Sequence, residues 1–377
     1  MTSAKKRIAL LTLNRFNSCL CDGVSNSSLE LLSFLKGQGH DVAVVGFLTD
    51  EPYRRQVFRH LADRSFVGMR YSAVLQGTPV HQELLPFKQE RLFDDTKVFL
   101  RAAAERLHRL DIGSAFTVED DFLALFAVSA LDVPGPHIFH SQSCARSFRQ
   151  FPFFLKLLGK KPVFVVSEFL KMSIQESLGV QAQVWPPLFD LGRYVVERKE
   201  APAASLGFYS AGPHKGDGVV NRLARSRPDW ELTVVGRNYG LPRGEKPANL
   251  RAMGDMTDLR EFYARTRVLL VPSLEPEGYP RVILEAAVNG IPAVANRIGG
   301  IPEAMGSSGI LLDFEPGVVD EARLDGLAQA YVREVDTLVS DPGLYAEFSR
   351  KARLRAKEYA AAQQAASQRN YEKYFSR

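Results

Sequence analysis

Short apolar runs alternate with longer amphipathic stretches along most of the chain, and this alternation limits the folds that the sequence can adopt. The strand-like runs fall into two sets, which cover residues 7–13, 41–47, 136–140 and 163–167, and then 206–210, 231–236, 267–273, 292–296 and 309–313. Runs of this length that are separated by helical patterns are typical of parallel strands covered by helices. The sequence therefore predicts an α/β protein.

The length of 377 residues suits two domains better than one hydrophobic core. Residues 196–205, VERKEAPAAS, are charged and then small and proline-containing, which is typical of a linker. We therefore expect an N-terminal domain over residues 1–197, a C-terminal domain over 198–357, and a last helix over 358–377 that crosses back to the first domain. Two α/β halves joined in this way predict a ligand-binding cleft between them.

Composition narrows the class of protein further. No apolar run approaches the roughly 20 residues that span a bilayer, and the N-terminus lacks the apolar core of a signal peptide, so we expect a cytoplasmic protein. The three cysteines, Cys19, Cys21 and Cys144, have neither disulfide nor zinc-site spacing; a redox role for Cys19 and Cys21 stays open. A net charge of +5 suits anionic substrates, and no nucleic-acid-binding motif is present.

Residues 267–290 predict a strand, a loop and a helix in direct succession. The apolar run RVLLVPS reads as a buried strand, and LEPEGYP is rich in residues that break regular structure. RVILEAAVNG has helical spacing and stops at Gly290, while Pro280 suits a first helical turn because its missing N–H has no partner there. This order places a helix N-terminus at the carboxyl end of a strand.

Such a helix N-terminus favours an anion, and a diphosphate would accept the backbone N–H groups of Tyr279, Arg281 and Val282. Glu277 lies in the loop just before the helix, and Glu285 follows after about one helical turn. Glu285 can face a ribose, while Glu277 lies near the group beyond the phosphates. The spacing therefore predicts that one nucleotide-sugar is bound at both ends.

The run PSLEPEGYPRVILEAAVNGIPAVANRIGGIPE, residues 272–303, resembles the retaining glycosyltransferases of family 4, which have the GT-B fold. The resemblance rests on the two glutamates separated by seven residues, followed by G-x-P and GG-x-x-E segments. Weaker similarities extend over most of the chain, at residues 39–46, 138–143, 165–174, 184–194, 214–218 and 250–256. The resemblance implies two Rossmann-like domains that face each other across a cleft, the first binding the acceptor and the second the nucleotide-sugar.

The resemblance also implies roles for individual residues. The catalytic set would be His140, which reaches the donor sugar from the N-terminal side, Lys215, which neutralises the diphosphate, and Glu277, which contacts the sugar near the reacting carbon. The implied donor-binding residues are Lys215, Gly216, Met256, Glu277, Gly278, Tyr279, Pro280, Arg281 and Glu285. Enzymes of this fold usually need no metal, which agrees with the absence of a D-x-D motif.

The chain departs from the family pattern in two places. The first loop lacks tandem glycines, and only Gly23 can be matched to them. The arginine expected a few residues before the Lys-Gly pair is also missing, since Tyr209 and Ser210 occupy that stretch. Arg237 or Arg281 could supply the missing charge of the diphosphate clamp.

Three further features have two interpretations each. Gly299 and Gly300 either contact a ligand or only form a tight turn. The acidic run Glu119, Asp120 and Asp121 either begins a helix or binds the acceptor. Residues 146–162, RSFRQFPFFLKLLGKKP, combine basic and aromatic residues without an acid, so this helix either contacts a membrane surface or packs its apolar face on the first domain.

We predict a metal-independent glycosyltransferase, hexosyl or related, that moves a sugar with retention from a nucleoside-diphosphate sugar to an acceptor hydroxyl. The first donor to consider is a UDP-sugar, and the acceptor would be a glycan, a lipid-linked molecule or a small molecule. The alternatives are a non-catalytic binding or scaffold protein on the same fold and a nucleotide-sugar epimerase. A dehydrogenase is disfavoured because no G-x-G-x-x-G follows the first strand.

Overall fold

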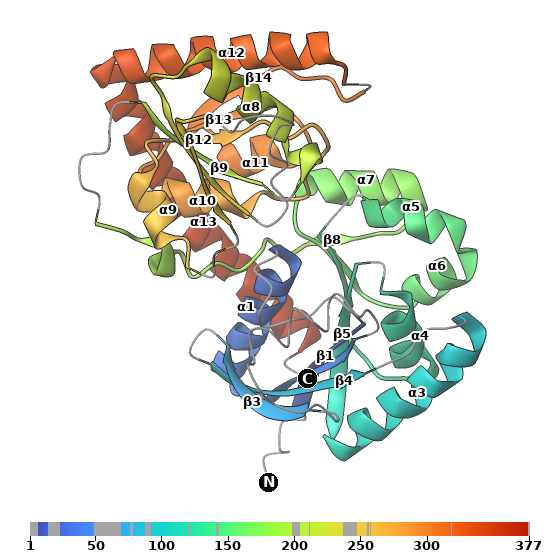
Figure 1. Cartoon of the computed structure of the whole chain (residues 1–377). Coiled ribbons are helices and arrows are strands. Elements are labelled where there is room, and N and C mark those ends of the chain that lie inside the picture. Colours follow the sequence, from blue (N-terminus) through green and yellow to red (C-terminus); the bar gives the residue numbers. More distant parts are fainter. Residues whose placement is uncertain are drawn as a thin grey trace. The chain divides into compact units, whose positions relative to one another are not determined.

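The computed structural model describes residues 7–13, 23–48, 69–75, 78–86, 92–119, 121–140, 143–197, 204–210, 212–236, 247–254, 256, 258–317 and 319–375. The chain divides into two compact units (Figure 1). Unit 1 comprises Met1–Leu188 and Ala366–Arg377, and unit 2 comprises Phe189–Ala365. These divisions fall before the expected boundary at residue 197 and after the one at residue 357. Residues 198–203 of the predicted linker lie outside the described residues.

Unit 1 alternates strands and helices along the chain. Its elements are β1 (Arg7–Leu13), α1 (Gly23–Gly37), β2 (Val42–Leu48), β3 (Met69–Leu75), β4 (Thr78–Pro86), α3 (Leu92–Arg109), β5 (Ile112–Val118), α4 (Phe122–Ala130), β6 (His137–Phe139), α5 (Ser143–Gln150), α6 (Pro152–Leu158), β7 (Val163–Val165), α7 (Glu168–Leu178) and β8 (Gln183–Val184). The strands form one sheet in the order β3-β4-β2-β1-β5-β6-β7-β8. All neighbouring pairs are parallel except β3 and β4, which are antiparallel.

Helices cover both faces of this sheet, as the side chains of β1 show. Ile8 and Leu10 join the core under α1, whereas Ala9 and Leu11 join the core under α3 and α4. Because successive side chains of a strand point to opposite faces, a strand with consecutive apolar residues needs cover on both faces. The four consecutive apolar residues 8–11 of RIALLTL therefore require helices on two sides of the sheet.

The last residues of the chain belong to unit 1. The helix α13 (Pro342–Tyr374) contributes Tyr371 and Ser367 to this unit. The Tyr371 hydroxyl lies 3.2 Å from Nε2 of His40, and the Trp185 indole N–H donates to Oγ of Ser367 at 2.9 Å. These buried polar contacts give the helix end a defined register on unit 1, because an unpaired buried polar group is costly.

Unit 2 is built around a second sheet whose neighbouring strands are all parallel, in the order β11-β10-β9-β12-β13-β14. Its elements before α13 are η1 (Leu191–Tyr194), β9 (Ser205–Tyr209), η2 (Pro213–Lys215), α8 (Asp217–Ser226), β10 (Glu231–Val235), β11 (Leu250–Gly254), α9 (Arg260–Arg265), β12 (Val268–Val271), α10 (Arg281–Ala287), β13 (Ala293–Asn296), α11 (Ile301–Met305), β14 (Gly309–Leu312) and α12 (Glu321–Ser340). Figure 1 shows α8 and α12 along one side of this sheet and α9, α10 and α13 along the other.

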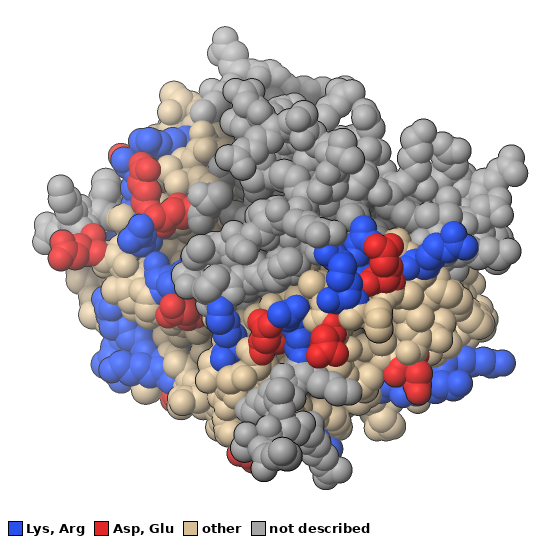
Figure 2. Space-filling view, turned by 90° about the horizontal axis from the view of Figure 1, so that it is seen from below, with Lys and Arg blue, Asp and Glu red and all other residues tan. Residues whose placement is uncertain are grey.

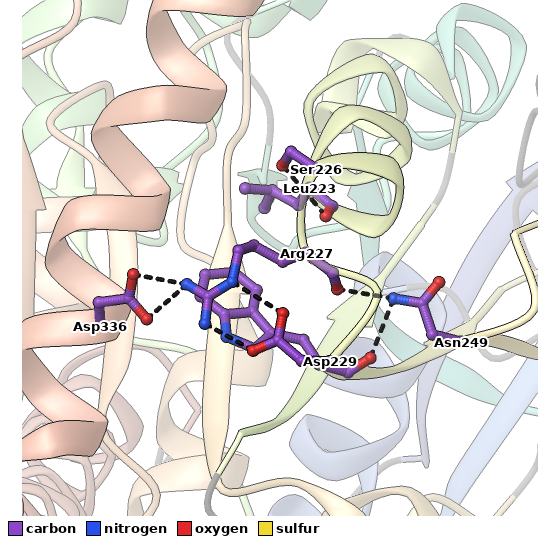
Figure 3. A network of polar contacts seen from close by, with 7 residues as sticks. Leu223, Ser226, Arg227, Asp229, Asn249 and Asp336 are labelled. Carbon is purple, nitrogen blue, oxygen red and sulfur yellow. Dashed lines mark hydrogen bonds and ion pairs between the residues drawn. The ribbon is translucent and has the colours of Figure 1, made fainter.

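A polar network joins α8 to α12 beside the core of unit 2 (Figure 3). The guanidinium of Arg227 binds both Asp336 of α12 and Asp229, and it lies 4.2 Å from the ring centre of the buried Trp230. The side-chain amide of Asn249 donates to the backbone carbonyls of Arg227 and Trp230, each at 2.9 Å. The paired carboxylates raise the pKa of Arg227 further, and they hold the end of α8 at a fixed position on α12.

Charged residues of both signs are interspersed on the described part of the face in Figure 2, which agrees with a modest net charge of +5. Within the described residues, no helix has the length and apolar character needed to cross a bilayer.

Candidate active site

The predicted strand, loop and helix over residues 267–290 are present in unit 2. All four residues of β12 are buried, and the loop after it contains Pro272, Pro276 and Pro280, which cannot donate a backbone hydrogen bond. Pro280 is the N-cap residue of α10 rather than its first helical residue, with φ −74° and ψ 101°. The helix is short, from Arg281 to Ala287, and a turn continues the chain to Gly290.

Lys215 lies on a second loop that packs against the first. This loop joins β9 to α8, and Gly216 within it has a φ of +96°, a conformation that favours glycine. A Cβ atom on Gly216 would lie 2.2 Å from the backbone oxygen of Pro272, so only glycine allows the two loops to approach so closely. The backbone N–H of Leu274 also donates to the carbonyl of His214 at 2.8 Å.

The two loops bring together two of the predicted catalytic residues. Nζ of Lys215 lies 2.6 Å from Oε2 of Glu277, and the side chains are 23% and 13% exposed. The second carboxylate oxygen of Glu277 accepts a hydrogen bond from the hydroxyl of Ser273. Both side chains of this ion pair are still reached by solvent. A ligand can therefore replace part of the contact between them with contacts to itself.

The second glycine pair supports the Glu277 loop directly. The backbone N–H of Gly300 donates to the carbonyl of Glu277 at 2.7 Å. A Cβ atom on Gly300 would lie 2.1 Å from the backbone oxygen of Gly278, and one on Gly299 would lie 2.6 Å from the backbone nitrogen and oxygen of Glu277. Both positions thus require glycine for the close approach of two backbone segments, and a ligand contact by either glycine stays a prediction.

Glu285 occupies a more enclosed position than the sequence suggests, with 3% of its surface exposed. The hydroxyl of Tyr263, from α9, donates to Oε2 of Glu285 at 2.7 Å, and Nε of Arg281 lies 3.4 Å from Oε1. Burial, together with the adjacent Glu285 carboxylate, raises the pKa of Tyr263 well above its usual value. Sequence reasoning missed Tyr263, since no motif marks it. A contact between Glu285 and a ribose remains a prediction.

The guanidinium of Arg281 is also enclosed, although the sequence makes it a candidate for the missing diphosphate clamp. It lies 4.2 Å from the ring centre of Phe189 and 3.5 Å from the hydroxyl of Tyr194, in addition to Glu285. A clamp role would require Arg281 to leave these contacts. The other candidate for that role, Arg237, lies outside the described residues.

Tyr279 points toward α13, within unit 2. Its hydroxyl accepts a hydrogen bond from Nη2 of Arg355 at 3.3 Å, and its ring centre lies 5.5 Å from that of Tyr359. Burial raises the pKa of the Tyr279 hydroxyl. The side chain therefore anchors the loop, and only the backbone of Tyr279 is left for the predicted donor contact.

His140 belongs to unit 1 and follows directly after β6. Its backbone N–H donates to Oε1 of Glu119 at 2.7 Å. Glu119 is fully buried and has a φ of +56°, which is unusual for a residue with a side chain. Strained backbone of this kind is often found at functional sites.

Within the acidic run of Glu119, Asp120 and Asp121, the last residue has a structural role. Asp121 is the N-cap residue of α4, and its side chain accepts a hydrogen bond from the backbone N–H of Ala124 at 3.2 Å. It also accepts a hydrogen bond from the hydroxyl of Thr12 at 2.8 Å. The helix-start interpretation is therefore right for Asp121, while Asp120 lies outside the described residues.

The remaining predicted residues have less defined surroundings. Gly23 is the first residue of α1, whereas the sequence places it in a loop before the helix. Met256 follows β11 and is half-buried, and both residues next to it lie outside the described residues. Within the described residues, no group of three or more His, Cys, Asp or Glu side chains is arranged to hold a metal ion.

Comparison with known proteins shows a family match in unit 2. Residues 218–334, all within unit 2, match the family model of glycosyl transferases group 1. Glycogen synthase of Mycobacterium tuberculosis (strain H37Rv) is 30% identical over 193 residues, which are 47% of this chain and 42% of that protein. A GDP-mannose-dependent alpha-(1-6)-phosphatidylinositol monomannoside mannosyltransferase of Mycolicibacterium smegmatis is 34% identical over 146 residues, 38% of this chain and 33% of that protein. The matched segments span 24–42% of the first curated relatives.

The solved structure of HepE from Anabaena in complex with UDP-glucose has the same fold over the whole length. Its TM-score is 0.67, at 16% identity, and the match covers 97% of this chain and 100% of that one. The two sheets with their helices and the group 1 segment in unit 2 agree with the fold that the sequence predicts. Residues 218–334 of unit 2 are therefore similar to the group 1 glycosyltransferases, and the fold of the chain is GT-B.

Proposed function

We propose that this protein transfers a sugar from a nucleoside-diphosphate sugar to an acceptor hydroxyl with retention of configuration. The contact between Lys215 and Glu277 carries the proposal. These residues are far apart in the sequence, and the resemblance separately assigns them to the diphosphate and to the sugar next to it. Their side chains meet at the carboxyl ends of β9 and β12, where ligands bind in open α/β sheets.

Lys215 and Glu277 can contact the diphosphate and the sugar of one donor at the same time. The ammonium of Lys215 has three N–H donors, so it can contact phosphate oxygens without leaving Glu277 completely. A carboxylate can accept about four hydrogen bonds, so Glu277 retains capacity for a sugar hydroxyl beside Ser273 and Lys215. The arrangement therefore suits a sugar diphosphate placed across the two loops.

In the proposed reaction, the bond between the anomeric carbon and the leaving phosphate oxygen breaks, and the acceptor oxygen bonds to that carbon from the same face. The acceptor proton passes to the leaving phosphate. Lys215 stabilises the negative charge that develops on the phosphate, and Glu277 orients the sugar. No protein nucleophile and no metal are assigned. A donor-sugar contact by His140 rests on the family resemblance.

A ligand screen tests the proposal directly. UDP, GDP and ADP, and the glucose and mannose derivatives of each, are added to the folded protein, and the melting midpoint is measured. A ligand at 100 times its Kd stabilises the folded state by about 2.7 kcal/mol, so binding raises the midpoint. We expect a UDP-containing ligand to give the largest increase, and Lys215→Ala to reduce it.

Product analysis completes the test. A transferase releases nucleoside diphosphate from the sugar donor, and a scaffold protein releases none. An epimerase would release the sugar of its donor without an acceptor. If no nucleotide raises the melting midpoint and no nucleoside diphosphate is released, the proposed function is wrong.

We also propose that residues 146–162 contact an anionic membrane surface. The segment forms α5 and α6, and it has a buried side as well as an exposed one. Phe148 and Leu158 are fully buried, while Phe151 and Phe153 are 42% and 55% exposed. Lys156 is exposed on the same helix as Phe153. Exposed aromatic rings beside a cation suit the interface of an anionic bilayer.

Sedimentation with vesicles tests this contact. We expect stronger binding to vesicles of phosphatidylglycerol than of phosphatidylcholine, because each basic residue near an anionic surface contributes about 1 kcal/mol. The double variant F151A/F153A should lose most of this binding. Leu354→Ala, which removes an exposed apolar side chain from unit 2, is the matched control and should leave it unchanged. Equal, weak binding of the native protein to both vesicles would refute the contact.

A further inference from the structure

The carboxylate of Glu277 has a second partner whose role the proposed function does not use. One oxygen contacts Lys215, which is assigned to the diphosphate, and the other accepts the hydroxyl of Ser273. When a diphosphate competes for Lys215, the contact between Lys215 and Glu277 weakens. Ser273 then becomes the protein contact that keeps the Glu277 carboxylate in place.

Ser273 is itself held by a buried chain of hydrogen bonds. The side-chain amide of Asn296 donates to the carbonyl of Ser273 at 2.9 Å, and its oxygen accepts the hydroxyl of Tyr331 at 3.1 Å. Asn296 ends β13, the strand next to β12, and Tyr331 lies on α12. All three residues are at most 1% exposed.

Because these hydrogen bonds are buried, they hold their side chains in one arrangement. A buried polar group that loses its partner costs about 1–3 kcal/mol, so each member of the chain favours a single arrangement of the next. A hydroxyl that donates to a carboxylate also makes a charge-assisted hydrogen bond. The chain therefore connects the core of unit 2 to one oxygen of Glu277.

We propose that Ser273 is a positioning residue, which fixes the Glu277 carboxylate against the sugar while Lys215 binds the diphosphate, and that Asn296 and Tyr331 fix Ser273. This inference rests on the proposed function for its consequence in catalysis. The contact between Ser273 and Glu277 does not depend on that function and can be tested without a donor.

The main test measures turnover of UDP-glucose, used as the probe, by the full chain. The measured signal is the release of nucleoside diphosphate. A misplacement of about 1 Å can cost up to about 10²-fold in rate, so we expect Ser273→Ala to lower kcat about tenfold. The KM for UDP-glucose should change less than about threefold, because Lys215 still binds the diphosphate. Tyr331→Phe, two contacts further away, should have a smaller effect in the same direction.

Ser308→Ala is the matched control. Ser308 is also 1% exposed, and its hydroxyl donates to the carbonyl of Met305 at 2.7 Å, away from Glu277. This variant removes a buried hydroxyl from the same unit and should leave kcat unchanged. If Ser308→Ala lowered kcat as much as Ser273→Ala, the effect would be general destabilisation and the positioning role would be wrong.

A double-mutant cycle shows whether Ser273 acts through Glu277. In the Glu277→Ala background, Ser273→Ala should have almost no further effect on the residual turnover, since the carboxylate that it positions is absent. A full tenfold loss in that background would overturn the proposal.

A second cycle uses the same variants in thermal unfolding and needs no donor. The two substitutions should lower the melting midpoint by less together than the sum of their separate effects, because they remove one shared contact. Additive midpoints would overturn the contact itself. If the native protein releases no nucleoside diphosphate from any donor but the midpoints are coupled, the proposed function fails while the Ser273–Glu277 contact stands.

Discussion

Replacing Glu277 or Lys215 by alanine is expected to reduce sugar transfer by about 10²–10³-fold, which is the usual cost of removing one preorganised charge from a reaction site. In the proposed reaction, Lys215 stabilises the leaving diphosphate, so Lys215→Ala should lower both kcat and donor binding. Glu277 orients the sugar in that reaction, so Glu277→Ala should lower kcat more than donor affinity. Steady-state release of nucleoside diphosphate, with the donor identified by the ligand screen, measures both effects.

Two other charged side chains of unit 2 provide controls for this prediction. Glu275 lies on the same loop, two residues before Glu277, and is exposed; Lys357 is an exposed lysine of unit 2. Glu275→Ala and Lys357→Ala remove the same charges and should retain transfer within about threefold of the native rate. A folded Glu277→Ala protein with native transfer would show that the residue has no part in the reaction.

Gly300→Ala is expected to reduce both activity and stability, although it adds a single methyl group. The new Cβ atom would lie 2.1 Å from the backbone oxygen of Gly278, so the Glu277 loop has to move. Overpacking of this kind costs about 1–3 kcal/mol, and for a unit of this size each kcal/mol lowers the melting midpoint by about 2–4 °C. Transfer should fall by more than about tenfold, because the displaced loop carries Glu277.

Gly326→Ala is the matched control for this substitution. Gly326 lies inside α12, and no heavy atom lies within 4 Å of the position of its added Cβ. Alanine stabilises a helix interior relative to glycine by about 0.5–1 kcal/mol, so this variant should be as stable as the native protein or more so. A melting midpoint and a transfer rate of Gly300→Ala equal to those of Gly326→Ala would show that the loop tolerates the methyl group.

Local signals in the sequence were sufficient for much of the fold. The strands β1, β2, β6, β7, β9, β10, β12, β13 and β14 each correspond to a predicted run, because an apolar segment that is buried on both faces is visible without knowledge of its neighbours. The strands β3, β4, β5, β8 and β11 were not predicted. β11 shows why: it lies at an edge of the sheet, Leu250 is its one buried residue, and its sequence LRAMG forms no apolar run.

In the candidate site, too, the sequence reveals the individual motifs but not the contacts between them. The motif around Glu277 and the Lys-Gly segment could be recognised from short stretches of sequence, and so could the glycine pair at 299 and 300. Their mutual contacts could not, since these depend on strand order. Lys215 meets Glu277 because β9 and β12 are parallel neighbours, and Asn296 reaches Ser273 because β13 lies beside β12.

The amino-acid sequence was enough to predict the α/β class, the two-part organisation, the family resemblance and the residues at the strand ends. The folded structure was needed to show which side chains those residues contact, including the enclosure of Glu285 by Tyr263 and Arg281 and the support of Glu277 by Ser273. The physical reason is that burial patterns and turn residues act over a few positions of the chain. Contacts between strand ends depend instead on sheet order and on packing between segments that are distant in sequence.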